Sequence, residues 1–283
     1  MSDEFLLTHL EDRVLTLTLN RPERLNALHP PLMRALREAL ADAAADARVG
    51  CVVLTGAGKG FCAGGDIGVA GGKGESQQKT PEQMAADAER AARKGSDTFE
   101  FRVNWLRESM ESVRLLHDMP KPTIASVNGA AAGAGFGLAA ACDFRVVADT
   151  AKFSTAFIQV GFSGDYGGTY FLTKLVGPMK ARELYLLGDR IDAHEAQRLG
   201  LVTKLVSADE LQSETRALAT RLANGPGIAQ RYMKATLNLA EHATLLEVLD
   251  AEAQYQTRTG QTEDHKEAAK AFFEKRKPVF KNM

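Results

Sequence analysis

Two glycine-rich segments hold the residues of this chain that are best suited to chemistry. One extends from Gly58 to Ile67 after the apolar run Cys51–Gly56, and the other begins at Asn128 after the apolar run Thr123–Val127. A turn almost free of side chains lets a ligand approach the backbone closely, and the first N–H groups of a following helix lack partners of their own. Two such turns supply two N–H donors that can converge on one oxygen, which is how an enolate oxyanion is stabilised.

Two better-known glycine motifs fit these segments less well. Gly133, Gly135 and Gly137 form G-x-G-x-G rather than the dinucleotide-binding G-x-G-x-x-G, and the nearest acid, Asp143, comes too early for a ribose contact. The segment Gly161–Asp165 resembles the esterase elbow G-x-S-x-G, but an aspartate occupies the place of the last glycine. The sequence therefore argues against a Rossmann site and a serine hydrolase. Turns that serve packing alone remain the plain alternative.

Composition and charge are those of an ordinary soluble globular protein. The 283 residues are 45% hydrophobic and 25% charged, and a net charge of −1 favours neither a nucleic-acid nor a membrane partner. The six histidines form no H-x-x-x-H pair, and Cys51, Cys62 and Cys142 lack metal-ligand spacing. We therefore expect no metal site, reduced thiols and a cytoplasmic location, since no apolar run approaches the roughly 20 residues that span a bilayer.

Hydrophobic periodicity predicts the elements that position the two turns. Leu15, Leu17 and Leu19 alternate with threonines, which predicts a strand over residues 13–19. Fully apolar runs predict strands buried on both faces, and strands alternating with helices indicate an α/β core. Further strands are expected at 51–56, 123–127 and 144–148, and a helix from Pro30 to about Asp46.

Two regions follow other patterns. Residues 68–95 are rich in glycine and polar side chains and predict a long loop, which is followed by one helix over about 98–117. Beyond Val206 the chain is predicted to be almost wholly helical, with an interruption at Asn224–Gly227.

Five segments, in order along nearly the whole chain, carry a resemblance to a known family. They are Asn20-Arg21-Pro22, FCAGGDI, VNGAAAGAGFGLAAACD, GGTYFLTKLVG and AFFEKRKPVF. Together they resemble the crotonase superfamily, the enoyl-CoA hydratase/isomerase proteins. The resemblance implies an α/β fold, a crotonase-like spiral of ββα units with a C-terminal helical trimerisation region.

The resemblance also implies a domain division, a substrate class and an assembly. Residues 1–206 would form the core with the CoA-ester site, and residues 207–283 would form helices for oligomerisation and for covering CoA. The substrate would be an acyl-CoA thioester, with coenzyme A as part of the substrate and no separate cofactor. The chain would assemble as a homotrimer or hexamer, without nucleic-acid or membrane partners.

Family site residues carry over by position. The resemblance places the oxyanion donors on the backbone N–H groups of Gly65 and Ala134. Phe272 and Lys275 match positions on a C-terminal helix that holds the nucleotide end, and a lysine suits a phosphate as a point charge. The alternative for Lys275 is a solvated face of a basic run. The remaining substrate-binding positions are Arg24, Ala27, Ala63, Gly64, Asp66, Ile67, Gly133, Phe157 and Tyr166.

Both acids of a family hydratase are missing. The first glutamate's place is Gly137 and the second is Phe157. Addition of water needs groups that deprotonate the water and deliver a proton to carbon, and neither residue can do so. We therefore expect hydration of crotonyl-CoA to be poor or absent.

Asp165 is the candidate replacement. It lies in SGDYGGT, at a place where some isomerases of the superfamily carry a catalytic aspartate. One base can move a proton between two carbons, so the favoured hypothesis is double-bond isomerisation of an enoyl-CoA with an aromatic or bulky acyl group. An aspartate pKa near 4 would need to be raised by an apolar setting. Candidates for that setting are Phe136, Phe157, Phe162 and Tyr166.

Several alternatives to this hypothesis stay open. Asp165 can instead cap the next helix, or act as nucleophile or base in acyl-CoA hydrolysis. Glu108 and Glu111 can supply a second carboxylate and restore hydratase chemistry, although a solvent-facing position is the usual expectation for them. A protein that binds acyl-CoA without catalysis is the alternative from another functional class.

Overall fold

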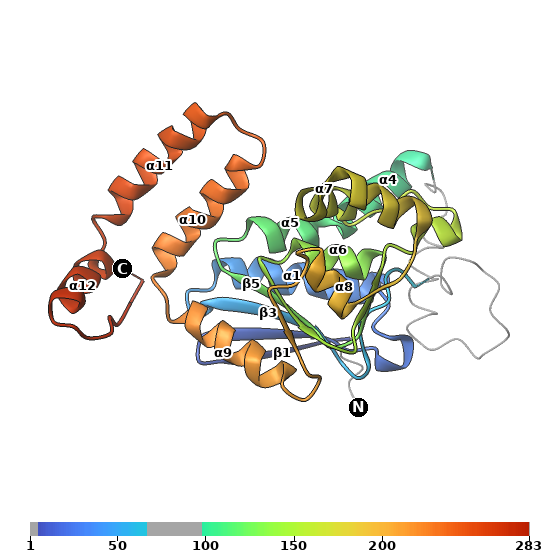
Figure 1. Ribbon diagram of the computed structural model, residues 1–283, viewed down its shortest axis with the longest axis horizontal. Coiled ribbons are helices and arrows are strands. Elements are labelled where there is room, and N and C mark those ends of the chain that lie inside the picture. Colours follow the sequence, from blue (N-terminus) through green and yellow to red (C-terminus); the bar gives the residue numbers. More distant parts are fainter. Residues whose placement is uncertain (1–4, 67–97, 283) are drawn as a thin grey trace.

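The computed structural model describes residues 5–66 and 98–282 and contains a large sheet covered by helices (Figure 1). Ile67 and the loop predicted at 68–95 lie outside the described residues. The large sheet has the order β1-β2-β3-β5-β7-β10; β1 is antiparallel to β2, and the other neighbouring pairs are parallel. Its strands are β1 (Leu6–Glu11), β2 (Val14–Leu19), β3 (Cys51–Gly56), β5 (Thr123–Val127), β7 (Phe144–Ala148) and β10 (Lys204–Val206).

Successive residues of these strands enter two different hydrophobic cores. Val52 packs into the core that contains α1 (Pro30–Ala45), whereas Val53 packs into the core that contains α9 (Leu211–Ala223). Side chains alternate across a strand, so a sheet buried on both faces requires continuous apolar runs. The strands and the helix predicted at 13–19, 51–56, 123–127, 144–148 and Pro30 to about Asp46 are confirmed.

Three strands of a smaller sheet directly follow strands of the large sheet. Strand β4 follows β3, β6 follows β5 and β8 follows β7, and a helix follows each of the last two pairs. This repeat of two strands and a helix is the expected ββα spiral. Because β4 and β6 are parallel neighbours, the turns that follow them lie at the same edge. The strands are β4 (Gly60–Cys62), β6 (Ala130–Ala132), β8 (Lys152–Ser154) and β9 (Ile191–Asp192).

The predicted helix over 98–117 is wrong in one respect, because it is two helices. Helix α4 (Phe99–Ser109) and α5 (Glu111–Asp118) meet at Met110. The Met110 carbonyl accepts the N–H of Val113 at 3.0 Å, an i+3 bond that tightens the chain and interrupts the α-helical ladder. The apolar spacing continues across this break, so periodicity alone does not reveal it. The other elements that the structure describes before residue 207 are η1 (Pro22–Arg24), α6 (Ala134–Ala141), η2 (Phe157–Val160), α7 (Gly168–Leu187) and α8 (Ala193–Arg198).

The last three helices form an arm that extends away from the sheets (Figure 1). Lys234, in the first helix of this arm, binds the arm to the rest of the structure. Its ammonium donates to the Asp143 carboxylate at 2.8 Å and to the Leu116 and Lys121 carbonyls. The domain division at residue 206 stays a prediction, and α9, just beyond it, packs on the large sheet. The arm consists of α10 (Gly227–Ala240), α11 (Leu245–Thr259) and α12 (Glu263–Phe273).

None of the helices in the described residues combines the length and the apolar character needed to cross a bilayer.

Candidate active site

The first glycine-rich turn is held against the segment Arg24–Leu28. The Ala63 N–H donates to the Leu25 carbonyl at 2.9 Å, and the Leu28 N–H donates to the Gly64 carbonyl at 2.7 Å. These two bonds form a short parallel ladder, with a bridge between Leu28 and the residue after Gly64. The structure thus brings five of the predicted substrate-binding residues together beside the predicted oxyanion donor Gly65: Arg24, Ala27, Ala63, Gly64 and Asp66.

The second turn lies directly against the first. Gly133 has φ +50° and ψ −122°, a conformation that glycine adopts far more readily than other residues. Its N–H donates to the Ser154 carbonyl at 3.0 Å. A Cβ atom placed on Gly64 would lie 3.4 Å from the Ala134 nitrogen. The backbones of the two turns therefore approach each other closely, and Gly133 orients the start of α6.

The N–H groups of Gly65 and Ala134 are left without acceptors by these turns. Neither N–H donates a hydrogen bond within the part of the chain that the structure describes. Ala134 begins α6, and the N-terminal N–H groups of a helix carry partial positive charge. The arrangement can hold an oxygen that becomes negative, and the roles of Gly65 and Ala134 as oxyanion donors stay a prediction.

A buried ion pair fixes the residue after Gly65. An Arg21 Nη atom lies 2.9 Å from the Asp66 carboxylate, with side chains only 11% and 8% exposed. Arg21 also donates to the Ala27 carbonyl, while the Asp66 N–H donates to the Leu28 carbonyl at 2.9 Å. The Asp66 carboxylate thus has a structural partner, and the predicted contact of Asp66 with the substrate stays a prediction.

The place of the first missing glutamate is filled by another residue. A Cβ atom on Gly137 would lie 2.5 Å from the Tyr166 carbonyl oxygen and 2.9 Å from the Tyr166 Cβ atom. Tyr166 is buried, has φ +50°, and its N–H donates to the Met110 sulfur at 3.2 Å. A side chain larger than that of glycine therefore does not fit at position 137 unless Tyr166 moves.

The place of the second missing glutamate forms part of an aromatic wall. The Phe157 Cζ atom lies 3.5 Å from where a Cβ on Gly133 would stand, so the ring reaches the oxyanion turn. The Phe157 ring is nearly parallel to that of Tyr185, at an interplanar angle of 9° and a centroid distance of 6.1 Å. This face of the Phe157 ring is apolar and cannot transfer protons.

Asp165 stands in the setting that a catalytic carboxylate would need. Burial raises the pKa of Asp165 to about 6, and its Oδ1 atom is buried without a hydrogen-bond partner. Helix α7 begins after Gly167 and receives no side-chain cap, so the helix-cap alternative is wrong. A half-buried carboxylate with a raised pKa and one buried oxygen without a partner is suited to accept a proton.

Comparison with known proteins identifies the family to which these features belong. The sequence profile of the enoyl-CoA hydratase/isomerase family matches residues 9–96 and 86–283. The chain belongs to the enoyl-CoA hydratase/isomerase family. The crotonase-like fold and the acyl-CoA chemistry of the family are thereby confirmed.

Individual members of the family are similar over their full lengths. The chain is 38% identical to the 1,2-epoxyphenylacetyl-CoA isomerase of Escherichia coli strain K12, covering 98% of each. It is 34% identical to the crotonyl-CoA hydratase of Syntrophomonas wolfei, covering 99% of each. The crystal structure of an enoyl-CoA hydratase from Polaromonas sp. JS666 superposes with a TM-score of 0.84 at 34% identity, covering 98% of this chain and 99% of that one.

Two other carboxylates of this family member are already paired. Glu108 forms an ion pair with Arg37, and the Arg114 guanidinium, which contacts Glu111, lowers the pKa of that carboxyl. Glu108 is 64% exposed at its side chain. The pairing and exposure agree with the solvent-facing expectation and disfavour either residue as a second acid beside Asp165.

The expected apolar setting of Asp165 is partly corrected. Phe162 is 62% exposed and turns away from the core, and Phe136 packs on Phe153 with a centroid distance of 5.1 Å. Only Phe162 is disfavoured by its exposure, whereas Phe136 and Tyr166 are buried and Phe157 is half-buried. Sequence reasoning missed Tyr185, which lies 20 residues further on and whose pKa is raised by burial and then by the charge of Asp165.

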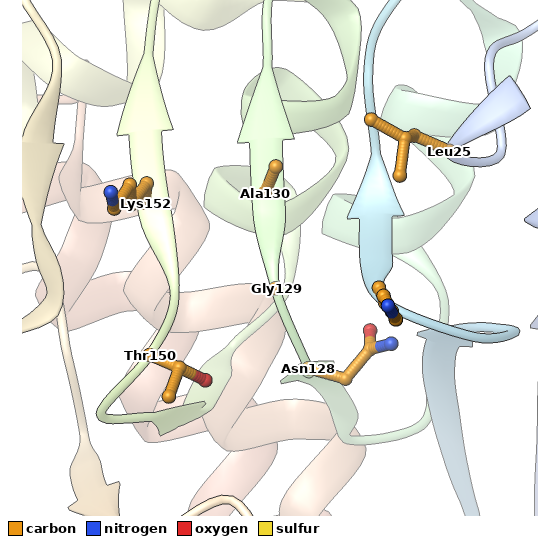
Figure 2. Close-up of a pocket in the computed structure, with 7 residues that line it drawn as sticks. Leu25, Asn128, Gly129, Ala130, Thr150 and Lys152 are labelled. Carbon is orange, nitrogen blue, oxygen red and sulfur yellow. The ribbon is translucent and has the colours of Figure 1, made fainter.

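Figure 2 shows a shallow pocket at the other ends of the small-sheet strands, where β4, β6 and β8 begin. The pocket has a volume of about 440 Å³ and adjoins Leu25, next to the predicted CoA contact Arg24. Lys59 and Lys152 line it, and neither has an acidic partner among the described residues. Its other lining residues are Asn128, Gly129, Ala130 and Thr150.

The two C-terminal predictions lie apart from the turns. Phe272 and Lys275 belong to the end of α12 and to the segment just after it, and both are exposed. Figure 1 shows α12 at the far end of the arm, away from α6 and α7. The structure therefore does not bring them to the site of their own chain, and Ile67 lies outside the described residues.

The described residues contain no group of three histidine, cysteine or acidic side chains that could hold a metal ion. Cys51, Cys62 and Cys142 are free and buried. Arg21 is a further site residue that sequence reasoning missed, although its place in the Asn20-Arg21-Pro22 motif is a signal that could have found it.

Proposed function

We propose that this protein is an acyl-CoA isomerase that shifts a carbon–carbon double bond by proton transfer through Asp165. The observation that carries the proposal is the half-buried Asp165 carboxylate, whose Oδ1 atom is buried without a partner and whose pKa is raised to about 6. A base is most effective when its pKa lies near the working pH. Asp165 meets that condition while both glutamates of a hydratase are absent.

The reaction needs one base and one oxyanion site. The carboxylate of Asp165 removes a proton from one carbon of the acyl chain, and the C–H electron pair moves through the conjugated system to the thioester oxygen. The Gly65 and Ala134 N–H groups bind that oxygen while it is negative. The carboxylic acid then returns the proton to a different carbon, so that the double bond has moved and no atom has been gained or lost.

The stacked rings of Phe157 and Tyr185 support a substrate with an aromatic or conjugated acyl group. Flat rings stack on flat, conjugated groups with additional attraction. A straight saturated chain gains only area burial there. We expect aryl-substituted or dienoyl substrates to be preferred over short aliphatic ones.

A second candidate is rearrangement of an epoxide-bearing aromatic acyl-CoA. It is favoured by the 38% identity with the 1,2-epoxyphenylacetyl-CoA isomerase of Escherichia coli. It is also compatible with the unpartnered buried oxygens of Asp165 and Tyr166, since buried polar atoms require partners.

The proposal also includes a binding place for the phosphates of coenzyme A and a neighbouring subunit in a homo-oligomer. Lys59 and Lys152 offer two cations to phosphate groups beside the Arg24–Leu28 segment. The arm carries Phe272 and Lys275 away from their own site, so in a homotrimer or hexamer they would serve the site of a neighbour. Large exposed apolar side chains on the arm support such an assembly: Met233, Leu237, Leu245, Leu246, Leu249, Phe272 and Phe273.

The test is incubation of the purified protein with aliphatic, aryl-substituted and epoxide-bearing acyl-CoAs in heavy water, followed by mass spectrometry. Isomerisation gives a product that contains no added water, keeps its CoA and separates from the substrate by chromatography before mass analysis. It carries deuterium at carbon only where the Asp165 carboxylic acid exchanges with solvent before it returns its proton. Addition of heavy water across the double bond would establish a hydratase instead. Release of free CoA would establish a hydrolase, and binding without any product would establish a non-catalytic protein.

A further inference from the structure

Helix α6, which begins with the predicted oxyanion donor Ala134, has few anchors of its own. All eight of its residues are buried, and each is apolar or a glycine. Two of them, Gly135 and Gly137, weaken a helix relative to alanine, and no side chain caps its first turn. The direction in which the Ala134 N–H points therefore depends on what the ends of the helix contact.

The side chain of Arg145, on strand β7, binds the C-terminal end of α6. Its Nη1 atom donates to three backbone carbonyls, those of Cys142 at 2.7 Å, Ala140 at 3.3 Å and Ala139 at 3.4 Å. Its Nε atom donates to the Leu201 carbonyl at 2.6 Å. The last carbonyls of a helix have no partner within the helix. One guanidinium thus satisfies these groups and ties the end of α6 to the segment before β10.

The charge on this guanidinium is buried and has no direct counter-charge. Arg145 is only 6% exposed, and within the part of the chain that the structure describes its guanidinium bonds only to backbone carbonyls. Burial lowers the pKa of Arg145, but a guanidinium stays protonated in proteins. The neighbouring Asp143 carboxylate is itself paired with Lys234 at 2.8 Å. The C-terminal end of α6 therefore carries a positive charge inside the protein.

A cation at this end of α6 changes what the other end offers to an anion. A helix carries partial negative charge at its C-terminus and partial positive charge at its N-terminus. The Arg145 charge offsets the negative end, so the positive end at the Ala134 N–H attracts a negative oxygen with less opposition. Eight residues make a helix about 12 Å long, and salt screens an interaction across the protein interior only weakly.

We propose that Arg145 is a positioning residue for the oxyanion site: it fixes the C-terminal end of α6 and supplies a positive charge that strengthens the hold of the Ala134 N–H on a negative oxygen. This inference rests on the proposed function, in which Ala134 is an oxyanion donor. Arg145 acts through the helix and does not contact the substrate. Since the charge favours the enolate over the neutral thioester, its loss lowers kcat and leaves KM unchanged.

The test uses variants at the ends of two helices. Arg145→Met and Arg145→Gln remove the charge, and the glutamine keeps one donor for the carbonyls should the methionine variant fail to fold. Arg145→Lys restores the charge. Arg13→Met is the matched control, because Arg13 donates to the Ala223 carbonyl at 3.2 Å at the end of α9, a helix without predicted site residues. Circular dichroism checks that each variant is folded.

The main measurement is the infrared stretching frequency of a bound thioester carbonyl. The probe is phenylacetyl-CoA labelled with carbon-13 at that carbonyl, which has no acyl double bond to move. Oxyanion donors polarise the carbonyl and lower its frequency, and we expect the lowering to be smaller in the neutral variants. Their kcat for isomerisation should fall by about 5–10-fold, as for a charge about 12–15 Å away at an effective dielectric constant of about 20. Arg145→Lys and Arg13→Met should keep wild-type values.

The outcomes separate this inference from the proposed function. A wild-type frequency in a folded neutral variant overturns the role of Arg145, even if the enzyme isomerises its substrate. A loss that Arg145→Lys does not restore assigns the residue to packing alone and also overturns it. A frequency that follows the charge, in a protein that isomerises nothing, upholds the inference and removes the proposed reaction. A wild-type protein that does not polarise the probe overturns the oxyanion role of Ala134 and this inference together.

Discussion

The two halves of the candidate site are built from different parts of the chain. The predicted oxyanion half uses the backbone N–H groups of Gly65 and Ala134, which a change to another small residue leaves in place. The proton-transfer half depends on side chains, and Gly137 and Phe157, at the predicted places of the two hydratase acids, carry no carboxylate. The comparison teaches that backbone donors tolerate substitution, whereas each side-chain acid can be lost by one exchange.

The largest effect is expected on the proton-transfer half. Asp165→Asn keeps the shape of the side chain but removes the base, and should lower kcat for isomerisation by roughly 10²–10⁴-fold. Binding of a substrate-like acyl-CoA should change little. Full isomerase activity in the purified variant would show that the acid/base group lies elsewhere.

A smaller loss is expected on the oxyanion half. Gly133→Ala forces a side chain onto φ +50° and shifts the Ala134 N–H, and should cost about 10–100-fold in kcat, less than removal of a whole oxyanion donor. Gly200→Ala is the matched control, since Gly200 has φ +80° with open space around it. Equal losses of activity in the two variants would mean that only general strain was measured.

Restoring the first acid should fail for a steric reason. Gly137→Glu places a side chain against the Tyr166 backbone at 2.5 Å, and overpacking of this kind destabilises by about 1–3 kcal/mol. Thermal unfolding and crotonyl-CoA hydration are the measurements, with Phe157→Glu as the comparison at the half-buried second place. A stable Gly137→Glu protein that hydrates crotonyl-CoA would contradict the packing described for Tyr166.

The smallest effect concerns stability and pH. The pKa of Asp165 is raised to about 6 in the folded protein, against about 3.9 in an unfolded chain. Between pH 4 and pH 6 the folded state binds the Asp165 proton more tightly than the unfolded chain does. Protonation of Asp165 therefore stabilises the fold below about pH 4, and this contribution to the free energy of unfolding is lost as the pH rises through 6. Asp165→Asn should therefore raise Tm by about 2 °C at pH 8 and by nothing at pH 4. A variant less stable than the wild type at pH 8 would refute this.

The sequence reveals the elements with long apolar runs and the turns without side chains. Strands such as β3 and β5 are recognisable because both faces are buried, whereas β6 and β8 are three residues long and too short to show a period. In the site, Gly65, Ala134 and Asp165 can be found through motifs. Arg21 lies in a motif and could have been singled out, but its pairing with Asp66 and the stacking of Tyr185 on Phe157 cannot be predicted, because they depend on packing between segments distant in the chain.

The close fit between Gly137 and Tyr166 also bears on how an acid could be built at this place. The atoms that a side chain at position 137 would meet are the Tyr166 carbonyl oxygen at 2.5 Å and the Tyr166 Cβ atom at 2.9 Å. Exchanging the phenol ring for a smaller side chain leaves these atoms in place. Room for a carboxylate there therefore requires a different course of the backbone beside Asp165, and not only a different pair of side chains.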